Sequence, residues 1–316
     1  MAITLSDVQM NTQDALCAQV IDEFRKSSFL LDRMPFDDAV SPHGGAAMTY
    51  AYTRVTTPPT AATRAINSEF VASEAKKQLL SVKLKVLGGA FKIDRVLAQM
   101  GGLTDEVQFQ VGQQIKATQA LFSDMVINGD VDSDANGFDG LNKAITGSST
   151  ELDAGGIDLS TSAKVTANYM EFLDLLDVAL SSVDGTPSCL LGNSAMIAKL
   201  RACARRATMY QTAMDNWGQQ IECYGAVPFI DLGEKAGTSE PIIGTSAGKT
   251  DLYIVRFGLD GFHGVSVSGQ SPIRTWLPDF TTSGAVKTGE VEMIAAVALK
   301  ASKAAAALRN IQVAVA

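Results

Sequence analysis

The sequence lacks most of the residues and motifs from which enzymes build an active site. Its 316 residues include only two histidines, His43 and His263, and no signature surrounds either of them. It contains no H-E-x-x-H zinc motif and no G-x-G-x-x-G segment after a strand. A Ser-His or Cys-His catalytic unit therefore has no support. We expect a protein that is not an enzyme and that needs no cofactor and no metal.

Cysteine and positive charge are also scarce. The four cysteines form no C-x-x-C pair, so buried thiols are a better interpretation than a metal site or a redox pair. The net charge is −8 and no Lys/Arg block is longer than two residues, which argues against a sequence-specific nucleic-acid binder. A surface that encloses nucleic acid without gripping it agrees with this charge. The cysteines are Cys17, Cys189, Cys203 and Cys223, and the one local basic patch is Arg201, Arg205 and Arg206.

Long hydrophobic runs are absent too. No apolar run approaches the ~20 residues that a membrane-spanning helix needs, and the first residues, MAITLSDVQMNTQDAL, show no basic segment followed by an apolar one. We therefore expect no membrane association and no signal peptide. With 46% hydrophobic and 19% charged residues, the composition is that of a globular protein folding in a reducing cytoplasm.

An N-terminal arm and an extended ribbon are predicted next. Residues 1–45 contain one helical segment and then break at Met34-Pro35 and at SPHGG. Residues 46–57 alternate like a strand, Pro58-Pro59 end it, and SVKLKVLGGAFKI alternates again after a long polar excursion. A two-stranded ribbon is barely stable in water. We expect it to lie on another surface, for which a second copy of the chain is a candidate.

One long helix is predicted over residues 104–127. Thr104, Asp105 and Glu106 cap its first turn and complement the helix dipole. Apolar residues then recur at helical spacing without a proline until Asn128-Gly129. Residues 166–284 alternate helices and strands, as in a compact mixed domain, and the last thirty residues return to strands.

Two motifs imitate ligand sites. GTSAGKT, residues 244–250, is one residue short of a phosphate-binding loop and precedes a strand instead of a helix, so we interpret it as a hairpin turn. DSDANG, from Asp132, imitates a calcium loop, but the twelfth position is Lys143 where a bidentate Glu is required. A turn rich in Asp and Asn explains the same residues, with weak calcium binding at 132–143 left open.

The organisation of the chain resembles the major capsid proteins of tailed bacteriophages, which share the Hong Kong 97-like fold. The most specific match is ALFSDMVINGDVDSDANGFDGLNKAI, which looks like the end of the family's spine helix and the loop after it. CYGAVPFIDLGE is similar to a strand of the family's axial domain, and KASKAAAALRNIQVA to the end of its peripheral domain.

The resemblance implies an α+β fold with five parts. These are an N-terminal arm at 1–45, an extended β-hairpin loop (E-loop) at 46–88, a peripheral domain at 89–165 with its spine helix at 104–127, an axial domain at 166–284, and a return to the peripheral domain at 285–316.

The resemblance also implies the function and the partners. The expected protein is a major head protein, a structural virion component that self-assembles through pentamers and hexamers into an icosahedral shell around phage double-stranded DNA. Its partners would be a separate scaffolding protein, a portal and decoration proteins, with assembly in the bacterial host cytoplasm. An encapsulin-like nanocompartment shell is the alternative, and a P-loop nucleotide hydrolase is a remote one.

Candidate intersubunit contacts are apolar and aromatic residues of the arm and the ribbon, because extended limbs gain stability by burying such groups against neighbours. Packing of the same residues within their own chain is the alternative. The candidates are Phe29, Leu30, Leu31, Tyr50, Tyr52, Phe70 and Val71.

Overall fold

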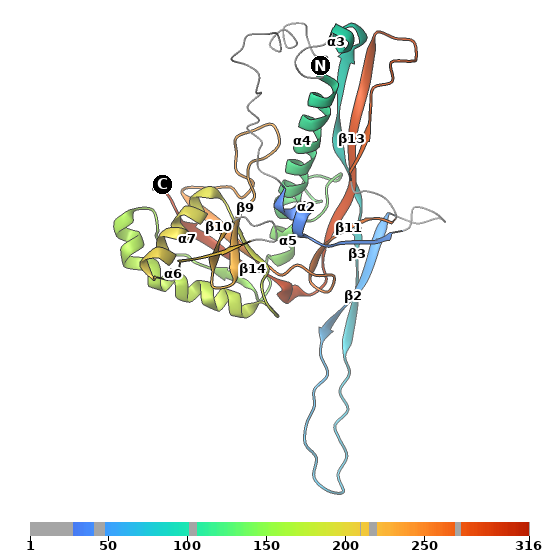
Figure 1. Cartoon of the computed structure of the whole chain (residues 1–316). Coiled ribbons are helices and arrows are strands. Elements are labelled where there is room, and N and C mark those ends of the chain that lie inside the picture. The colour runs from blue at the N-terminus through green and yellow to red at the C-terminus, as the bar shows by residue number, and fades with distance from the viewer. Residues whose placement is uncertain are drawn as a thin grey trace.

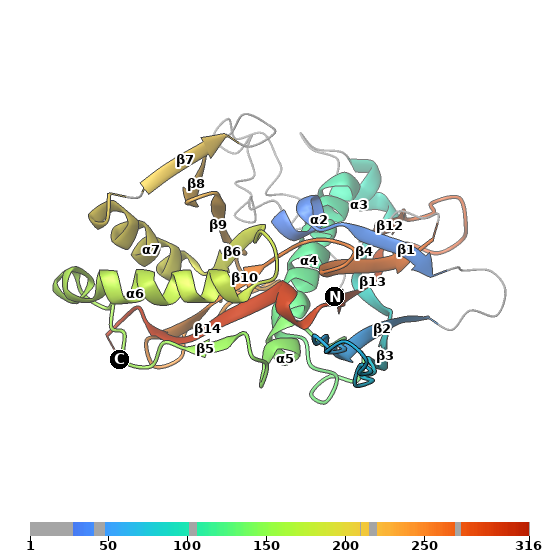
Figure 2. The ribbon, with the colours of Figure 1, turned by 90° about the horizontal axis from the view of Figure 1, so that it is seen from below.

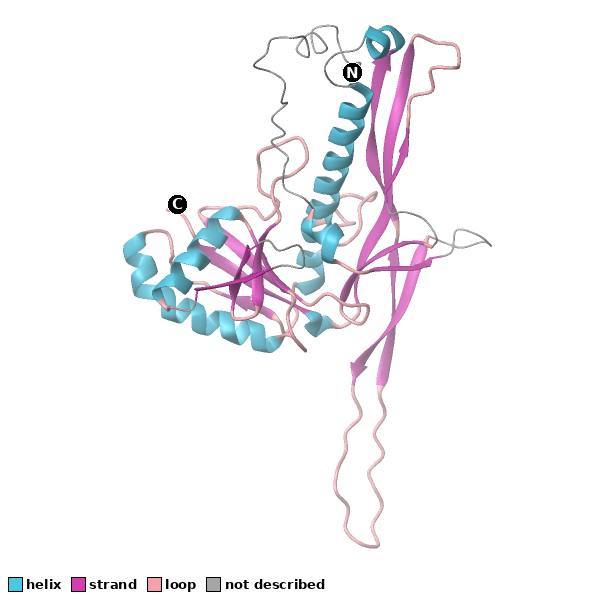
Figure 3. Ribbon diagram, viewed as in Figure 1, coloured by secondary structure: helices cyan, strands magenta, loops and turns pink. Residues whose placement is uncertain are grey.

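The computed structural model describes residues 28–40, 48–100, 106–208, 210–214, 220–268 and 273–315. Most of the arm helix expected before Leu31 therefore lies outside the described residues. The chain forms a lobe of helices and strands, an upright helix beside long strands, and a narrow ribbon that projects away from both (Figure 1). The loop that ends the ribbon extends well beyond its paired strands (Figure 3).

The elements alternate along most of the chain. The helices are α2 (Phe29–Arg33), α3 (Arg95–Met100), α4 (Glu106–Asn128), α5 (Leu141–Ile145), α6 (Ser162–Ser182), α7 (Ser194–Arg206) and the 3-10 turn Ser302–Ala304. The strands are β1 (Phe36–Val40), β2 (Thr49–Thr57), β3 (Lys76–Lys83), β4 (Lys85–Asp94), β5 (Glu151–Asp153), β6 (Cys189–Gly192), β7 (Tyr210–Met214), β8 (Gln220–Tyr224), β9 (Val227–Asp231), β10 (Lys249–Val255), β11 (Phe262–Val267), β12 (Ile273–Trp276), β13 (Val286–Leu299) and β14 (Ala305–Gln312).

A seven-stranded sheet in the order β5-β14-β10-β6-β9-β8-β7 forms the centre of the lobe. Successive side chains of a strand point to opposite faces, and here both faces are buried. Leu252 and Ile254 of β10 pack with α6 and α7, whereas Tyr253 and Val255 face the core beneath α4. Burial on both faces explains why the second half of β10, residues 252–255, is continuously apolar. Helices α6 and α7 lie along one side of this sheet (Figure 2).

The second sheet is organised by β13. This strand pairs along one edge with β11 and β12 and along the other with β4, while β1 joins parallel to β11. Its C-terminal half carries small apolar residues, of which Ala295 and Ala296 are fully buried. Small side chains allow the strand to lie close to the helix above it.

Helix α4 confirms the predicted spine helix. It packs against β4 and β13, and its C-terminal half enters the core through Phe122, Val126 and Ile127, which are fully buried. The helix ends where predicted because Gly129 and Gly140 meet backbone to backbone, with the Gly140 N–H donating to the Gly129 carbonyl at 2.8 Å. A Cβ at position 129 would lie 2.2 Å from the carbonyl oxygen of Phe138, so only glycine fits. Within the described ranges no helix is long and apolar enough to cross a membrane.

The predicted ribbon is also present. Strands β2 and β3 pair antiparallel from Thr49 opposite Lys83 to Thr57 opposite Lys76, and the excursion between them has no regular structure. After Leu84 the chain continues as β4 into the second sheet. The ribbon is therefore joined directly to the strands beside the spine helix.

The sheet topology differs from the expected domain boundaries at two places. Strands β5 and β14 were expected in the peripheral part, but they pair with each other and complete the seven-stranded sheet through β10. Strands β11 and β12 were expected in the axial part, but they pair with β13. The reason is that both sheets are built from strands distant in sequence, a pairing that no local pattern encodes. The remaining boundaries stay predictions.

Candidate functional site at the ribbon

The ribbon tip is held in shape by its own polar contacts. Ser73 Oγ accepts from the backbone N–H of Thr60 at 3.0 Å and donates to the Thr60 carbonyl at 2.9 Å, which ties the two sides together. Nearer the end, the Arg64 guanidinium donates to the carbonyl of Ser68 at 3.0 Å and lies 5.3 Å from the centre of the Phe70 ring. The tip thus has a defined local conformation although no other part of the chain that the structure describes covers it.

Apolar side chains gather at this uncovered tip. Ile66 and Val71 are each 90% exposed and Phe70 is 64% exposed. Farther back, Leu79 and Val55 are 72% and 54% exposed. Isolated exposed apolar residues are common, but a group of them on a limb without a core indicates an interaction surface. Ile66, Leu79 and Val55 were not among the predicted contacts, although Val55 belongs to the alternating segment 46–57, which could have indicated it.

The base of the ribbon, by contrast, is firmly attached to the second sheet. We call Tyr50, Tyr52 and Arg54 the ribbon root; they alternate along β2 and so share one face. Tyr52 donates its hydroxyl to the carbonyl of Leu299 at 3.1 Å. Arg54 donates Nε to the carbonyl of Lys300 at 2.8 Å and Nη2 to that of Leu299. These bonds satisfy carbonyls at the end of β13, where the sheet offers no further strand.

Tyr50 is the most deeply set residue of the root. Its hydroxyl donates to Asp37 Oδ2 at 2.6 Å, and the Lys300 ammonium lies 5.3 Å from its ring centre. Burial, together with the hydrogen bond to Asp37, raises the pKa of Tyr50 above its ordinary value. The phenol therefore remains a hydrogen-bond donor throughout the physiological range, and it links β2 to β1.

The predicted contact residues separate into two groups. Leu30 is fully buried in its own chain, Tyr50 is 7% exposed, and Phe29, Leu31 and Tyr52 are partly buried against the same core. For these five the packing is within the chain, the alternative left open by the sequence, because α2 and the root close the core over α4. Only Phe70 and Val71 present their side chains to the outside.

The acidic loop after the spine helix places Lys143, the residue at the twelfth position of the calcium pattern, among three carboxylates. Lys143 Nζ lies 2.5 Å from Asp130 Oδ1, 2.7 Å from Asp132 Oδ2 and 3.0 Å from Asp139 Oδ1. The hydrogen bond from Lys143 lowers the pKa of Asp130, and the three carboxylates raise the pKa of Lys143. The described residues contain no cluster of His, Cys, Asp and Glu able to hold a metal ion. The Lys143 ammonium group thus balances the negative charge of these three carboxylates.

The segment 244–250 is a hairpin turn, as predicted. Ser246 and Lys249 exchange backbone hydrogen bonds of 2.9 Å around Ala247 and Gly248, both of which have positive φ. Residues 244–248 also match the spacing G-x-S-x-G of a nucleophile elbow. That elbow needs a strand before it and a helix after it, whereas strand β10 follows here. The turn supports neither phosphate binding nor a nucleophile.

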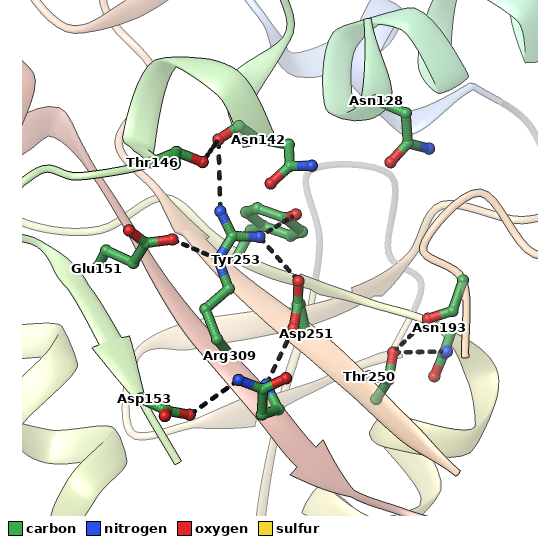
Figure 4. A network of polar contacts seen from close by, with 12 residues as sticks. Asn128, Asn142, Thr146, Glu151, Asp153, Asn193, Thr250, Asp251, Tyr253 and Arg309 are labelled. Atoms are coloured by element: carbon green, nitrogen blue, oxygen red, sulfur yellow. Dashed lines mark hydrogen bonds and ion pairs between the residues drawn. The ribbon is translucent and has the colours of Figure 1, made fainter. Parts of the chain in front are cut away.

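A buried arginine joins the two halves of the protein (Figure 4). Arg309 of β14 is paired with Glu151 at 2.9 Å and with Asp251 at 2.8 Å, and it donates to the Tyr253 hydroxyl at 2.8 Å. It also reaches the carbonyl of Asn142 in α5 at 3.4 Å. The seven-stranded sheet is thereby fixed to the segment that follows the spine helix.

No family model matches this sequence, and no curated protein does either. Solved structures do match. The holo-SrpI encapsulin complex from Synechococcus elongatus PCC 7942 superposes with a TM-score of 0.68 at 15% identity, covering 99% of this chain and 97% of that one. The capsid of the native GTA particle gives 0.58 at 12% identity over 91% of each chain. The capsid of Myoviridae phage XM1 gives 0.57 at 10% identity, covering 98% and 99%.

These structures confirm the fold. At such low identity the likeness is one of architecture, and it extends over nearly the whole chain. The chain has the α+β Hong Kong 97-like fold that phage capsids and encapsulins share, as the sequence predicted.

Proposed function

We propose that this protein is the major capsid protein of a tailed bacteriophage, a structural subunit that assembles with copies of itself into a closed shell around double-stranded DNA. The observation that carries the proposal is the ribbon, which projects from the body with a shaped but uncovered apolar tip. A limb of this kind costs conformational entropy and buries nothing in a monomer. Seated on a neighbour, it buries apolar surface at ~25 cal/mol per Å².

The fold supports the same proposal. Shells are the setting in which this architecture is found in the GTA particle and in phage XM1. In this assignment the ribbon reaches a neighbouring subunit, and the lobe built on the seven-stranded sheet meets other copies around the fivefold and sixfold axes. The net charge of −8 suits a shell that contains DNA without gripping it. Scaffolding, portal and decoration proteins remain the expected partners.

The second candidate is an encapsulin-like compartment that encloses protein cargo. It is favoured by one observation, the TM-score of 0.68 to the SrpI encapsulin, which is higher than those to the two capsids described above. The two candidates share the self-assembling shell and differ in what the shell contains and in whether assembly needs a separate scaffold.

Electron microscopy of the expressed full-length chain tests both candidates. We expect closed particles, formed with a co-expressed scaffolding protein if the chain is a phage capsid, or formed alone if it is an encapsulin. A chain that stays monomeric at all concentrations, both alone and with scaffold, would contradict the shell function. Mass spectrometry of the purified particles then tests for a protein cargo, which is expected for an encapsulin-like compartment and not for a phage capsid.

Truncation of the arm tests its role, and the structure sets where the cut must fall. Removal of 1–45 would delete Leu30 and Met34, which are 0% and 3% exposed in the core, together with strand β1. That variant should not fold. Removal of 1–27 keeps every described contact, so we expect a folded subunit that fails to close particles. Normal particles from the shorter truncation would contradict the role of the arm.

A further inference from the structure

A histidine is sealed beneath the ribbon root. His263 lies on β11 and is 0% exposed. Its ring meets the edge of the Tyr50 ring, with centroids 5.8 Å apart and planes at 77°. Tyr50 belongs to β2, the first strand of the ribbon, so a residue of the ribbon root covers the imidazole.

Neither nitrogen of this imidazole has a hydrogen-bond partner of good geometry among the described residues, although the Gly261 backbone lies near enough to stabilise a proton on the ring. Among the same residues, the only other buried side-chain nitrogen or oxygen in that state is Nε of Arg256, whose guanidinium is bonded to Asp260 through Nη1. A buried polar group without a partner destabilises the folded state by about 1–3 kcal/mol. Such a group therefore calls for an explanation.

The charged surroundings give no compensation for a proton on His263. The groups around it are Tyr50 from β2, Asp37 from β1, Lys300 after the end of β13, and Asp260 before β11. Asp37 already accepts from Tyr50 and lies 3.7 Å from Lys300, so its charge is shared. Burial, assisted by the positive charge of Lys300, lowers the pKa of His263, and the Gly261 backbone and the two carboxylates oppose this more weakly.

We propose that His263 makes the attachment of the ribbon sensitive to pH: the neutral imidazole permits Tyr50 to sit on it, and protonation releases the ribbon root from the second sheet. When Tyr50 moves away, the ring reaches water and regains ordinary hydration. The released root thus binds a proton more readily than the seated root does.

The sign of the effect follows from linkage. A histidine whose pKa is lower in the seated state than its ordinary value of 6.5 favours seating fully above pH 6.5. As the pH falls below that value, only the released state takes up the proton, so the equilibrium shifts from the packed root to the released root. The shift ends once the pH is below the pKa of His263 in the packed state. Because one proton is involved, the equilibrium shifts by up to tenfold per pH unit in this window.

Hydrogen exchange measured by mass spectrometry on the full-length protein tests the proposal. Protection of peptides from β2 and β3 near the root, corrected for the intrinsic pH dependence of exchange, should fall by up to about tenfold per pH unit between about pH 6.5 and 5. Protection of β6, which lies in the seven-stranded sheet, should not change. Ordinary carboxyl groups titrate below this window, near pH 4.

Matched variants assign the effect to one residue. His263→Phe keeps an aromatic ring and cannot titrate, and His263→Gln is a polar alternative; in each, root protection should be independent of pH. His43→Gln removes the other histidine of the chain and should keep the wild-type profile. If neither variant of His263 folds, a step in the wild type that persists in His43→Gln supports the proposal.

Three results would overturn it. These are a wild-type root whose protection is the same at both ends of the window, a pH step retained in His263→Phe or His263→Gln, and a step lost in His43→Gln. Because the readout is local to the chain, none of these outcomes depends on whether the protein forms a shell.

Discussion

Replacing Ile66, Phe70 and Val71 by serine removes the apolar tip of the ribbon without touching the core. Fully burying an aliphatic or aromatic side chain contributes about 1.5–3 kcal/mol. Because the three residues are 90%, 64% and 90% exposed in the free chain, nearly all of that contribution is available to a neighbour. At the low end of that range, their combined burial is worth roughly 4 kcal/mol per contact. At 1.4 kcal/mol per factor of ten, the contact should weaken about a thousandfold.

The assay is light scattering against protein concentration, followed by electron microscopy. The threshold concentration for particle formation should rise steeply in the triple serine variant, while its urea unfolding midpoint stays close to that of the wild type, since exposed sites usually change stability by less than about 0.5 kcal/mol. A conservative control, with Ile66→Val, Phe70→Leu and Val71→Ile, should assemble like the wild type. Assembly of the serine variant at the wild-type threshold would refute the assignment of the tip as a contact surface.

Three further changes test other features. Arg309→Met should lower the free energy of unfolding by about 3 kcal/mol, the low end for a broken buried ion pair, because its two carboxylates keep 25% and 30% exposure; urea titration should show a loss well above that of Arg201→Met, which breaks a half-exposed pair. Lys143→Glu should unfold at a lower temperature than Lys143→Gln in chelator and recover in millimolar calcium, because it restores the twelfth ligand of the acidic loop; equal melting with and without calcium would argue against that geometry. Wild type and Lys249→Ala should both bind ATP only at background level, since turn 244–250 has no helix after it. ATP binding that is lost in Lys249→Ala would contradict this.

The local elements were predictable where the signal was local. The spine helix was expected at 104–127 and is seen at Glu106–Asn128, because its apolar spacing and the Asn-Gly stop agree. The cap expected at Thr104 and Asp105 lies outside the described residues. Helix α6 starts at Ser162, ahead of the alternating region expected at 166–284, since Thr161 accepts a hydrogen bond from the Lys164 backbone and caps a polar first turn. That signal was present in the sequence, but it carries no apolar periodicity.

The arrangement of the strands was not predictable from the same patterns. The last residues were expected to return to the peripheral domain, and no local pattern in the alanines of β14 indicates that it pairs with β10 and β5. At the candidate site, five of the seven predicted contact residues pack in their own chain, whereas Phe70 and Val71 are exposed and their role as contacts stays a prediction. Apolarity alone does not distinguish an interface from a core, and only the three-dimensional position of α2 and the ribbon root does.

The pairing of β4 with β13 has a consequence for how the subunit is made. β4 is synthesised early, and its partner follows roughly two hundred residues later. Until then one edge of β4 and the whole ribbon remain unsatisfied on a growing polypeptide, and unpaired strand edges invite aggregation. Cells that produce this protein in quantity should therefore depend on chaperones that shield nascent chains, and its yield should fall sharply when translation outruns their supply.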